Sequence, residues 1–219
     1  MGQSVIPKLH TGVLSPEQVH ILKATAPFTK SWGAYLAGGL ALGLQRGHRT
    51  SHDFDWFTKE TISPKELERA VGSFGLAVKV NQNNEGTFLA TLGNTDFSVF
   101  RYPYPVIKTF ESGGCDIASL RDIGAMKLSA ICQRVEPRDY VDLFEIVESL
   151  PLREIVVAWK TKYPHADHKF PLKALVYFSD VEKKVDRTMP KMLNGVTWAN
   201  VRKGLEKAVE RYFARGIER

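Results

Sequence analysis

The sequence contains few cysteines and no long apolar run. Cys115 and Cys132 are the only two cysteines among 219 residues, and they do not form a CxxC pair. They offer neither a disulfide framework nor a thiolate zinc site, which is expected in a reducing cytoplasm. No apolar stretch approaches the roughly 18 residues of a membrane-spanning helix, and the first ten residues lack the layout of a signal peptide. We therefore expect a cytoplasmic protein with no membrane partner.

The composition is globular, and the positive charge is concentrated in the last third of the chain. Hydrophobic residues make up 43% of the sequence and charged residues 25%, which provides a core and argues against disorder. Residues 1–150 contain 15 Lys and Arg against 16 Asp and Glu, whereas residues 151–219 contain 15 against 8. Such a basic segment favours an anionic partner, nucleic acid first of all, although a solvated lysine-rich helix surface would give the same balance.

Helices and strands alternate in the first half of the sequence, and helices alone fill the second half. Capping residues and apolar periodicity predict helices at 15–27, 31–47, 63–74, 119–134, 138–149, 152–162, 169–185 and 198–214. Alternating apolar residues predict strands at 52–58, 75–82, 87–93 and 95–102, the last three forming a meander, with a connector at 101–116. The order predicts an α+β unit over residues 1–115 and a helical domain over residues 116–219.

Two aspartates stand close together in the otherwise apolar stretch HDFDWF. Since residues i and i+2 of a strand share a face, Asp53 and Asp55 project together, while Phe54 and Trp56 pack on the other side. The two carboxylates repel each other and burial raises their pKa values, so a divalent cation would stabilise both. Oxygen ligands alone favour Mg²⁺ or Mn²⁺ over zinc. A surface pair or a turn would also contain Asp-x-Asp, so the surrounding residues decide.

Two nearby features support a phosphate-handling site. Gly38 and Gly39 at the edge of a helix permit close backbone approach, and their N–H groups can hold a phosphate; a packing or turn role is the alternative. Asp96 begins an alternating strand. If that strand lies beside the strand of Asp53, Asp96 becomes a third carboxylate that binds the metal or acts as the base for an attacking hydroxyl.

A pair of adjacent helices carries further charged residues. Lys127 and Arg134 are seven positions apart and share a helix face, and Asp139 and Asp142 are i, i+3 neighbours on the next helix. A lysine among apolar residues either reaches water or meets an anion such as phosphate or carboxylate. A structural ion pair between the helices is the alternative. We favour it for Arg134 and Asp139, and for Lys127 and Asp142 both interpretations stand.

The stretch YLAGGLALGLQRGHRTSHDFDWF resembles the first motif of the DNA polymerase β-like nucleotidyltransferase superfamily, in which a glycine pair precedes an acid-x-acid strand. Within that superfamily the sequence is most similar to the AbiEii/AbiGii group, the nucleotidyltransferase toxins of type IV toxin–antitoxin systems. A later block of that group reads KLSAICQRVEPRDYVDL here, and the resemblance extends from about residue 31 to residue 202. It implies a mixed sheet flanked by helices, followed by a helical C-terminal part.

The resemblance also implies roles for individual residues. Gly38 and Gly39 would contact the nucleotide triphosphate, and Asp53 and Asp55 would hold the metal. Lys127 would neutralise phosphate charge. The implied catalytic residues are Asp53, Asp55, Asp96, Lys127 and Asp142, of which the first three are the metal ligands. The strand that bears the third acid varies within the superfamily. Independently of the resemblance, the position of Arg49 just before the acid pair would let it touch phosphate, although an ordinary loop role is equally expected.

The implied activity is Mg²⁺-dependent transfer of a nucleoside monophosphate (NMP) from a nucleoside triphosphate (NTP) to a hydroxyl, by a toxin with a cognate antitoxin. The 3′ end of tRNA is the first expected acceptor. A small molecule or a protein is the alternative acceptor, and a non-catalytic nucleotide-binding protein is the alternative to an enzyme. Leu40 favours the last alternative, because relatives usually have Thr or Ser after the glycine pair.

Overall fold

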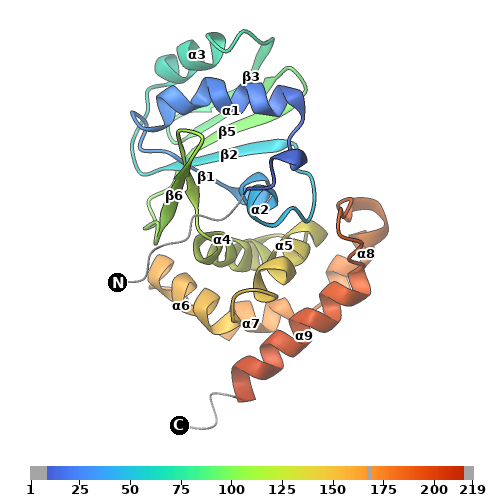
Figure 1. Ribbon diagram of the computed structural model, residues 1–219. Coiled ribbons are helices and arrows are strands. Elements are labelled where there is room, and N and C mark those ends of the chain that lie inside the picture. Colours follow the sequence, from blue (N-terminus) through green and yellow to red (C-terminus); the bar gives the residue numbers. More distant parts are fainter. Residues whose placement is uncertain (1–8, 167–168, 215–219) are drawn as a thin grey trace. The chain divides into compact units, whose positions relative to one another are not determined.

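The computed structural model describes residues 9–166 and 169–214, which divide into two compact units (Figure 1). The first unit contains the described residues up to Tyr104 together with Thr109–Ala118, and the second contains Pro105–Lys108 and the described residues from Ser119 onward. The predicted domain boundary between residues 115 and 116 lies inside a strand of the first unit, β7 (Cys115–Ala118).

Within the described residues, the first unit is built on a seven-stranded mixed sheet in the order β3-β4-β5-β2-β1-β7-β6. Strand β2 is near its centre, parallel to β5 and antiparallel to β1. The expected meander is confirmed as β3-β4-β5. The remaining strands are β1 (Tyr35–Ala37), β2 (Asp53–Thr58), β3 (Val78–Asn84), β4 (Thr87–Leu92), β5 (Thr95–Arg101) and β6 (Thr109–Ser112).

Three helices complete the first unit, after a short 3-10 turn at Thr11–Val13: α1 (Pro16–Thr29), α2 (Gly38–Arg46) and α3 (Pro64–Gly72). Helix α1 begins as expected, because Ser15 and Gln18 form a capping box and Pro16 occupies the first turn. It continues past Pro27, where the sequence suggested a stop. Helices α1 and α3 contact each other, and α1 lies in front of the sheet in Figure 1.

Two segments differ from the sequence-based expectation. Tyr35–Ala37, expected at the start of a helix, forms β1, because it pairs with both β2 and β7 and sheet pairing overrides the local helical pattern. The expected connector contains the hairpin of β6 and β7. Its two-residue turn, Gly113-Gly114, has a positive φ at both positions, as such hairpin turns require.

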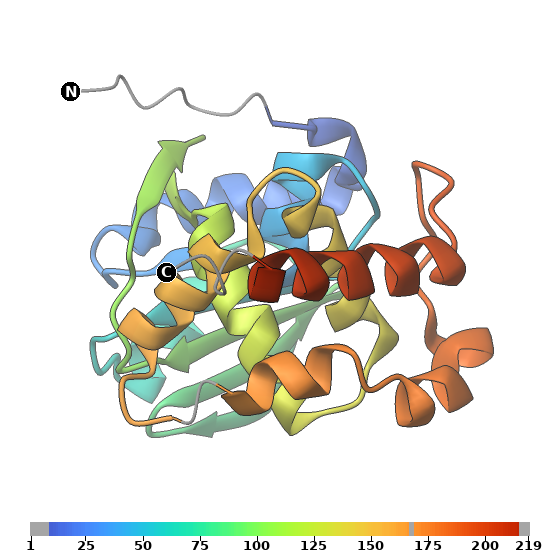
Figure 2. The same cartoon turned by 90° about the horizontal axis from the view of Figure 1, so that it is seen from below.

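Six helices form the described part of the second unit: α4 (Leu120–Gln133), α5 (Pro137–Val147), α6 (Leu152–Lys162), α7 (Lys169–Leu175), α8 (Ser179–Thr188) and α9 (Trp198–Ala214). Helix α9 packs on α5 and α6 (Figure 2). The single helix expected over 169–185 is divided into α7 and α8. The break allows Phe178 to turn inward, where its ring lies 6.0 Å from both Tyr140 and Trp198.

A buried ion pair holds the segment Pro105–Lys108 against the helices of the second unit, to which it belongs. Asp122 and Lys162 have fully buried side chains whose charged atoms are 3.0 Å apart. Asp122 accepts hydrogen bonds from the backbone N–H groups of Ile107 (2.8 Å) and Lys108 (3.0 Å), and Lys162 donates to the carbonyl of Pro105. The segment therefore satisfies charges that would otherwise be costly to bury.

None of the described helices is long and apolar enough to span a bilayer. Both cysteines are free thiols, as expected from their spacing, and burial raises the pKa of Cys115 and of Cys132 to about 11. Such thiols carry little thiolate at neutral pH.

Candidate active site

The two aspartates of HDFDWF lie on β2 as the alternation predicts. Asp53 and Asp55 are half-buried on one face of the strand, and Phe54 and Trp56 are fully buried on the other. The rings of Phe54 and Trp56 stack at 6.5 Å with an interplanar angle of 10°. This apolar packing fixes the strand, so the two carboxylates are presented together on its opposite face.

Gly38 brings the N-terminus of α2 directly against one of these carboxylates. Ala37, the last residue of β1, pairs with Asp55, and Gly38 then turns the chain into α2 with a φ of +69°. A Cβ atom at Gly38 would collide with the carboxylate of Asp55, lying 3.2 Å from both its Cβ and its Cγ. No side chain caps α2 in the described structure. Its first N–H groups and its dipole favour an anion at this point.

Gly39 creates a similar close approach to Arg49. A Cβ atom there would collide with the guanidinium group and would lie 3.0 Å from the hydroxyl of Ser51. Arg49 is buried, and its Nη1 donates to the carbonyl of Thr50 over 2.8 Å. Arg49 thus lies against the glycine pair. No sequence pattern indicated Ser51, since a serine in a short loop matches no motif. Leu40 is fully buried in α2.

Asp96 lies on the strand next to the acid pair. Strand β5 runs parallel to β2 with Asp96 opposite Asp53, so the adjacency on which its predicted role depends is present. Its side chain is exposed and accepts a hydrogen bond from the hydroxyl of Thr91 at 3.3 Å. Among the described residues, no group of three or more His, Cys, Asp or Glu is placed to hold a metal ion. The metal-binding role of Asp96 therefore stays a prediction.

The donor set of Asp53 and Asp55 fits a magnesium ion. Mg²⁺ commonly takes one or two carboxylates from a protein and completes its octahedral shell with water and substrate phosphate oxygens. The two side chains share one face of β2 beside the N-terminus of α2, where phosphate is favoured. A bound ion would offset the repulsion between the two carboxylates.

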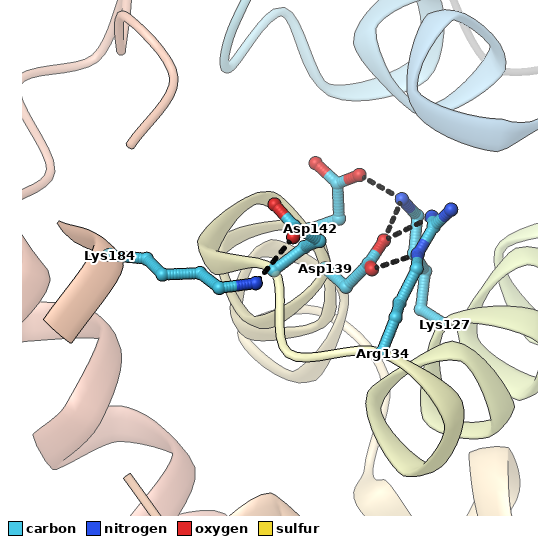
Figure 3. A network of polar contacts seen from close by, with 6 residues as sticks. Lys127, Arg134, Asp139, Asp142 and Lys184 are labelled. Carbon is cyan, nitrogen blue, oxygen red and sulfur yellow. Dashed lines mark hydrogen bonds and ion pairs between the residues drawn. The ribbon is translucent and has the colours of Figure 1, made fainter. Parts of the chain in front are cut away.

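The predicted residues of the second unit form a buried network of their own (Figure 3). Lys127 Nζ on α4 lies 2.8 Å from Asp139 Oδ1 and 2.6 Å from Asp142 Oδ2 on α5. Arg134 donates from Nε to Asp139 Oδ2 (2.8 Å) and from Nη2 to Asp139 Oδ1 (3.1 Å). The structural pairing favoured for Arg134 and Asp139 is present, and Lys127 joins it to Asp142.

Burial and charge act in opposite directions on Asp139. Both carboxylates of the network are fully buried, whereas the side chain of Arg134 is 50% exposed. Burial would raise the pKa of Asp139, but the charge of Lys127 and the hydrogen bonds from Arg134 and Lys127 lower it below its ordinary value. Asp139 therefore stays ionised and holds both cations.

The second unit also contains a cavity of about 350 Å³ between α4 and α6. Its lining residues are Ile107, Arg121, Arg153, Glu154, Val157, Ala158 and Thr161. None of the predicted site residues lines it, and Arg121 and Glu154 on its wall pair with each other. The cavity is therefore distinct from the Lys127 network.

The sequence matches a family model and a related protein. Residues 20–214 match the family described as nucleotidyl transferase AbiEii toxin, type IV toxin–antitoxin system. The chain is also 34% identical over 158 residues to an uncharacterized protein of Aquifex aeolicus strain VF5, covering 69% of this chain and 76% of that protein.

Solved structures of three proteins are similar in fold. JHP933 from Helicobacter pylori is 17% identical with a TM-score of 0.57, covering 92% of this chain and 93% of its own. The antibiotic-resistance factor ANT(2″)-Ia is 18% identical with a TM-score of 0.52, covering 68% and 89%. MenT4, a nucleotidyltransferase toxin from Mycobacterium tuberculosis H37Rv, is 12% identical with a TM-score of 0.50, covering 89% and 84%.

The similar solved structures and the family match agree with the fold of this chain. The predicted fold, a mixed sheet flanked by helices with a helical C-terminal part, is confirmed. The family match spans both units and includes every predicted site residue. The chain is a nucleotidyltransferase, and it belongs to the AbiEii family of nucleotidyl transferase toxins of type IV toxin–antitoxin systems.

Proposed function

We propose that the protein transfers an NMP from an NTP to the 3′ end of tRNA in a Mg²⁺-dependent reaction, as a cytoplasmic toxin with a cognate antitoxin. The observation that carries the proposal is the close approach of the α2 N-terminus to Asp55, which only a glycine at position 38 allows. This arrangement sets a phosphate-binding helix end beside a pair of metal-binding carboxylates.

In this proposal the glycine pair and Arg49 bind the triphosphate. The N–H groups at the start of α2 donate to phosphate oxygens, and the guanidinium group beside Gly39 adds a positive charge. Asp53 and Asp55 hold Mg²⁺, or Mn²⁺ in its place, which would offset the negative charge of the phosphates. These roles need no residue outside the first unit.

The transfer is a displacement at the α-phosphorus of the NTP. A new bond forms from the acceptor hydroxyl oxygen to the α-phosphorus, the bond from that phosphorus to the bridging oxygen breaks, and pyrophosphate leaves. The carboxylate of Asp96 receives the proton of the hydroxyl. The register of β5, in which Asp96 lies opposite Asp53, supports this role of Asp96.

Lys127 and Asp142 supply the remaining catalytic roles. Lys127 neutralises phosphate charge, and Asp142 orients the ammonium group from 2.6 Å. The burial of this ion pair supports the proposal, since a buried lysine retains its charge only where carboxylates offset the cost of desolvation. Asp142 therefore acts by positioning Lys127.

The proposed acceptor is an RNA because of the charge of the last third of the chain. Residues 151–219 contain 15 Lys and Arg against 8 Asp and Glu. Some of these cations are already used in surface ion pairs, such as Arg202 with Glu182 and Lys183 with Asp180. The remaining excess would attract the RNA backbone, and binding would weaken as the salt concentration rises.

Label transfer tests the proposal directly. The protein is incubated with Mg²⁺, total RNA and each of the four NTPs labelled at the α-phosphate. We expect RNase-sensitive label in RNA of tRNA size, lost in Asp53→Asn and kept in Asp180→Asn, a half-exposed aspartate of α8. No transfer with any NTP would contradict the proposal. Label that survives RNase would identify a protein or small-molecule acceptor, and toxicity unchanged by Asp53→Asn would indicate a binding function.

A further inference from the structure

We propose that helix α7 and the turn after it bind single-stranded RNA, with two bases stacked on the rings of Phe170 and Tyr177 and the phosphate between these bases at Lys173. This inference rests on the proposed RNA acceptor. It names a binding surface for that partner within the second unit, on residues that the transfer reaction itself does not use.

Phe170 and Tyr177 are unusually accessible for aromatic side chains. Tyr177 is 59% exposed and Phe170 is 56% exposed. Among the described residues, Phe213 is the only other Phe, Tyr or Trp that is more than half exposed. Each ring forgoes the free energy that its burial would contribute to folding. Rings that are this accessible can stack with the bases of a bound RNA.

Helical periodicity separates a buried side of this segment from an exposed side. The buried side consists of three residues at spacings of three: Leu172, Leu175 and Phe178. Phe170, Lys173 and Tyr177 are exposed, and they are three and four residues apart, the spacing at which side chains share a helix face. The two rings therefore lie on one surface, with the ammonium group between them.

The helical path continues far enough to include Tyr177. Helix α7 packs on α4 and leads into α8 (Figure 1). Beyond its last residue, the N–H of Val176 donates to the carbonyl of Lys173 (3.3 Å), and the N–H of Tyr177 donates to the carbonyl of Ala174 (3.2 Å). These bonds add one tight turn. Phe170 and Tyr177 are thus about two turns apart, roughly 10 Å along the axis.

The order of ring, cation and ring matches one strand of RNA, in which two successive bases flank one phosphate. Aromatic rings stack on bases of any sequence, and a lysine offers a point charge to the backbone. Lys173 is exposed and forms no ion pair with any other described residue. Asp180, at the start of α8, is offset by Lys183 at 2.9 Å. The cation between the rings favours RNA over an apolar protein surface.

Binding of a labelled oligonucleotide tests the inference. The probe is a fluorescent oligo(U) of about 12 nucleotides, measured alone and paired with oligo(A). We expect Phe170→Ala and Tyr177→Ala each to weaken binding of the single strand about tenfold. Both variants should bind the duplex like wild type, because its bases are not open to stacking. Phe213→Ala removes a similarly exposed ring from α9 and is the matched control, expected to bind both probes like wild type.

The salt dependence of binding separates stacking from charge. We expect Lys173→Gln to weaken binding of the single strand and to make the plot of log affinity against log salt concentration shallower by about 0.7. Lys173→Arg, which keeps the charge, and the two ring variants should keep the wild-type slope. All the substituted side chains are exposed, so the variants are expected to fold, and thermal unfolding verifies this.

Wild-type affinity for the single strand in both ring variants would overturn the inference. A dimer that Phe170→Ala and Tyr177→Ala dissociate, in a protein that does not bind the oligonucleotide, would also overturn it, since the rings would then contact a second copy. Failure of the proposed function is a different result. RNA binding that depends on the rings, without label transfer, contradicts the proposed function alone, whereas label transfer with unchanged RNA binding in both ring variants contradicts this inference alone.

Discussion

Gly38 shows how the absence of one side chain shapes the candidate active site. The residue adopts a φ of +69°, and the space that a Cβ atom would need is filled by the carboxylate of Asp55. A glycine-rich motif in the sequence indicates a close approach of some kind. Only the structure identifies its partner as the second carboxylate of the acid pair.

Gly38→Ala is expected to reduce activity more than stability. Left-handed backbone costs an alanine about 1–2 kcal/mol, and displacement of Asp55 should lower label transfer by about a hundredfold. Gly75→Ala is the matched control, because Gly75 has a φ of +70° and open space where its Cβ would lie. Urea unfolding and label transfer are measured for both. Equal activities of the two variants would contradict the role assigned to the contact.

At the scale of elements, the first turn of α5 contains a carboxylate, Asp139, whose charge responds to acid. The pKa of Asp139 lies below its ordinary value, because Lys127 and Arg134 outweigh the opposing effect of burial. A carboxyl group with a lowered pKa stabilises the folded state above its pKa in the unfolded chain. This contribution is lost as the pH falls through its pKa in the folded state.

The stability difference between wild type and Asp139→Asn should therefore depend on pH. We expect the variant to be less stable by about 3–5 kcal/mol near neutral pH, since two cations lose a buried partner. The difference should be constant above about pH 5 and shrink below about pH 4. Urea unfolding of both proteins over this range measures it. A difference that does not change with pH would contradict the assignment of the lowered pKa to Asp139.

At the scale of the whole molecule, the chain passes between its two units more than once. Pro105–Lys108 belongs to the second unit, although Thr109–Ala118 after it returns to the first. The N–H of Ser119 donates to the carbonyl of Lys108 over 3.0 Å, so the two parts of the second unit meet at this point. The second unit is therefore discontinuous in sequence.

Two fragments of the second unit, one with the segment Pro105–Lys108 and one without it, should differ in stability. A chain of residues 119–219 leaves Asp122 without the N–H groups of Ile107 and Lys108, and Lys162 without the carbonyl of Pro105. The fragment to compare with it contains 105–108 joined to 119–219 by a short Gly-Ser linker in place of residues 109–118. We expect the fragment of residues 119–219 alone to be less stable than this linked fragment by at least about 3 kcal/mol. Thermal unfolding compares them. Equal stability would show that the segment is dispensable.

Local patterns predicted much of this protein, because they need only neighbouring residues. Alternation placed Asp53 and Asp55 on one face of a strand, and capping residues located the start of α1. The strand β1 was missed, since its partners β2 and β7 are distant in sequence. The hairpin of β6 and β7 was missed because each of its strands has only four residues, too few for a clear alternation. The division of α7 from α8 was missed because a buried aromatic cluster around Phe178 determines it.

The same distinction holds for the candidate site. The sequence by itself determined its chemistry: paired carboxylates after a glycine pair, and Lys127 with acids on the next helix. Tertiary structure decided the partners, setting Gly38 against Asp55, Gly39 against Arg49, and Asp139 between Lys127 and Arg134. The physical reason is that a residue type fixes what a side chain can bind, whereas packing over long sequence distances fixes which groups come within binding distance.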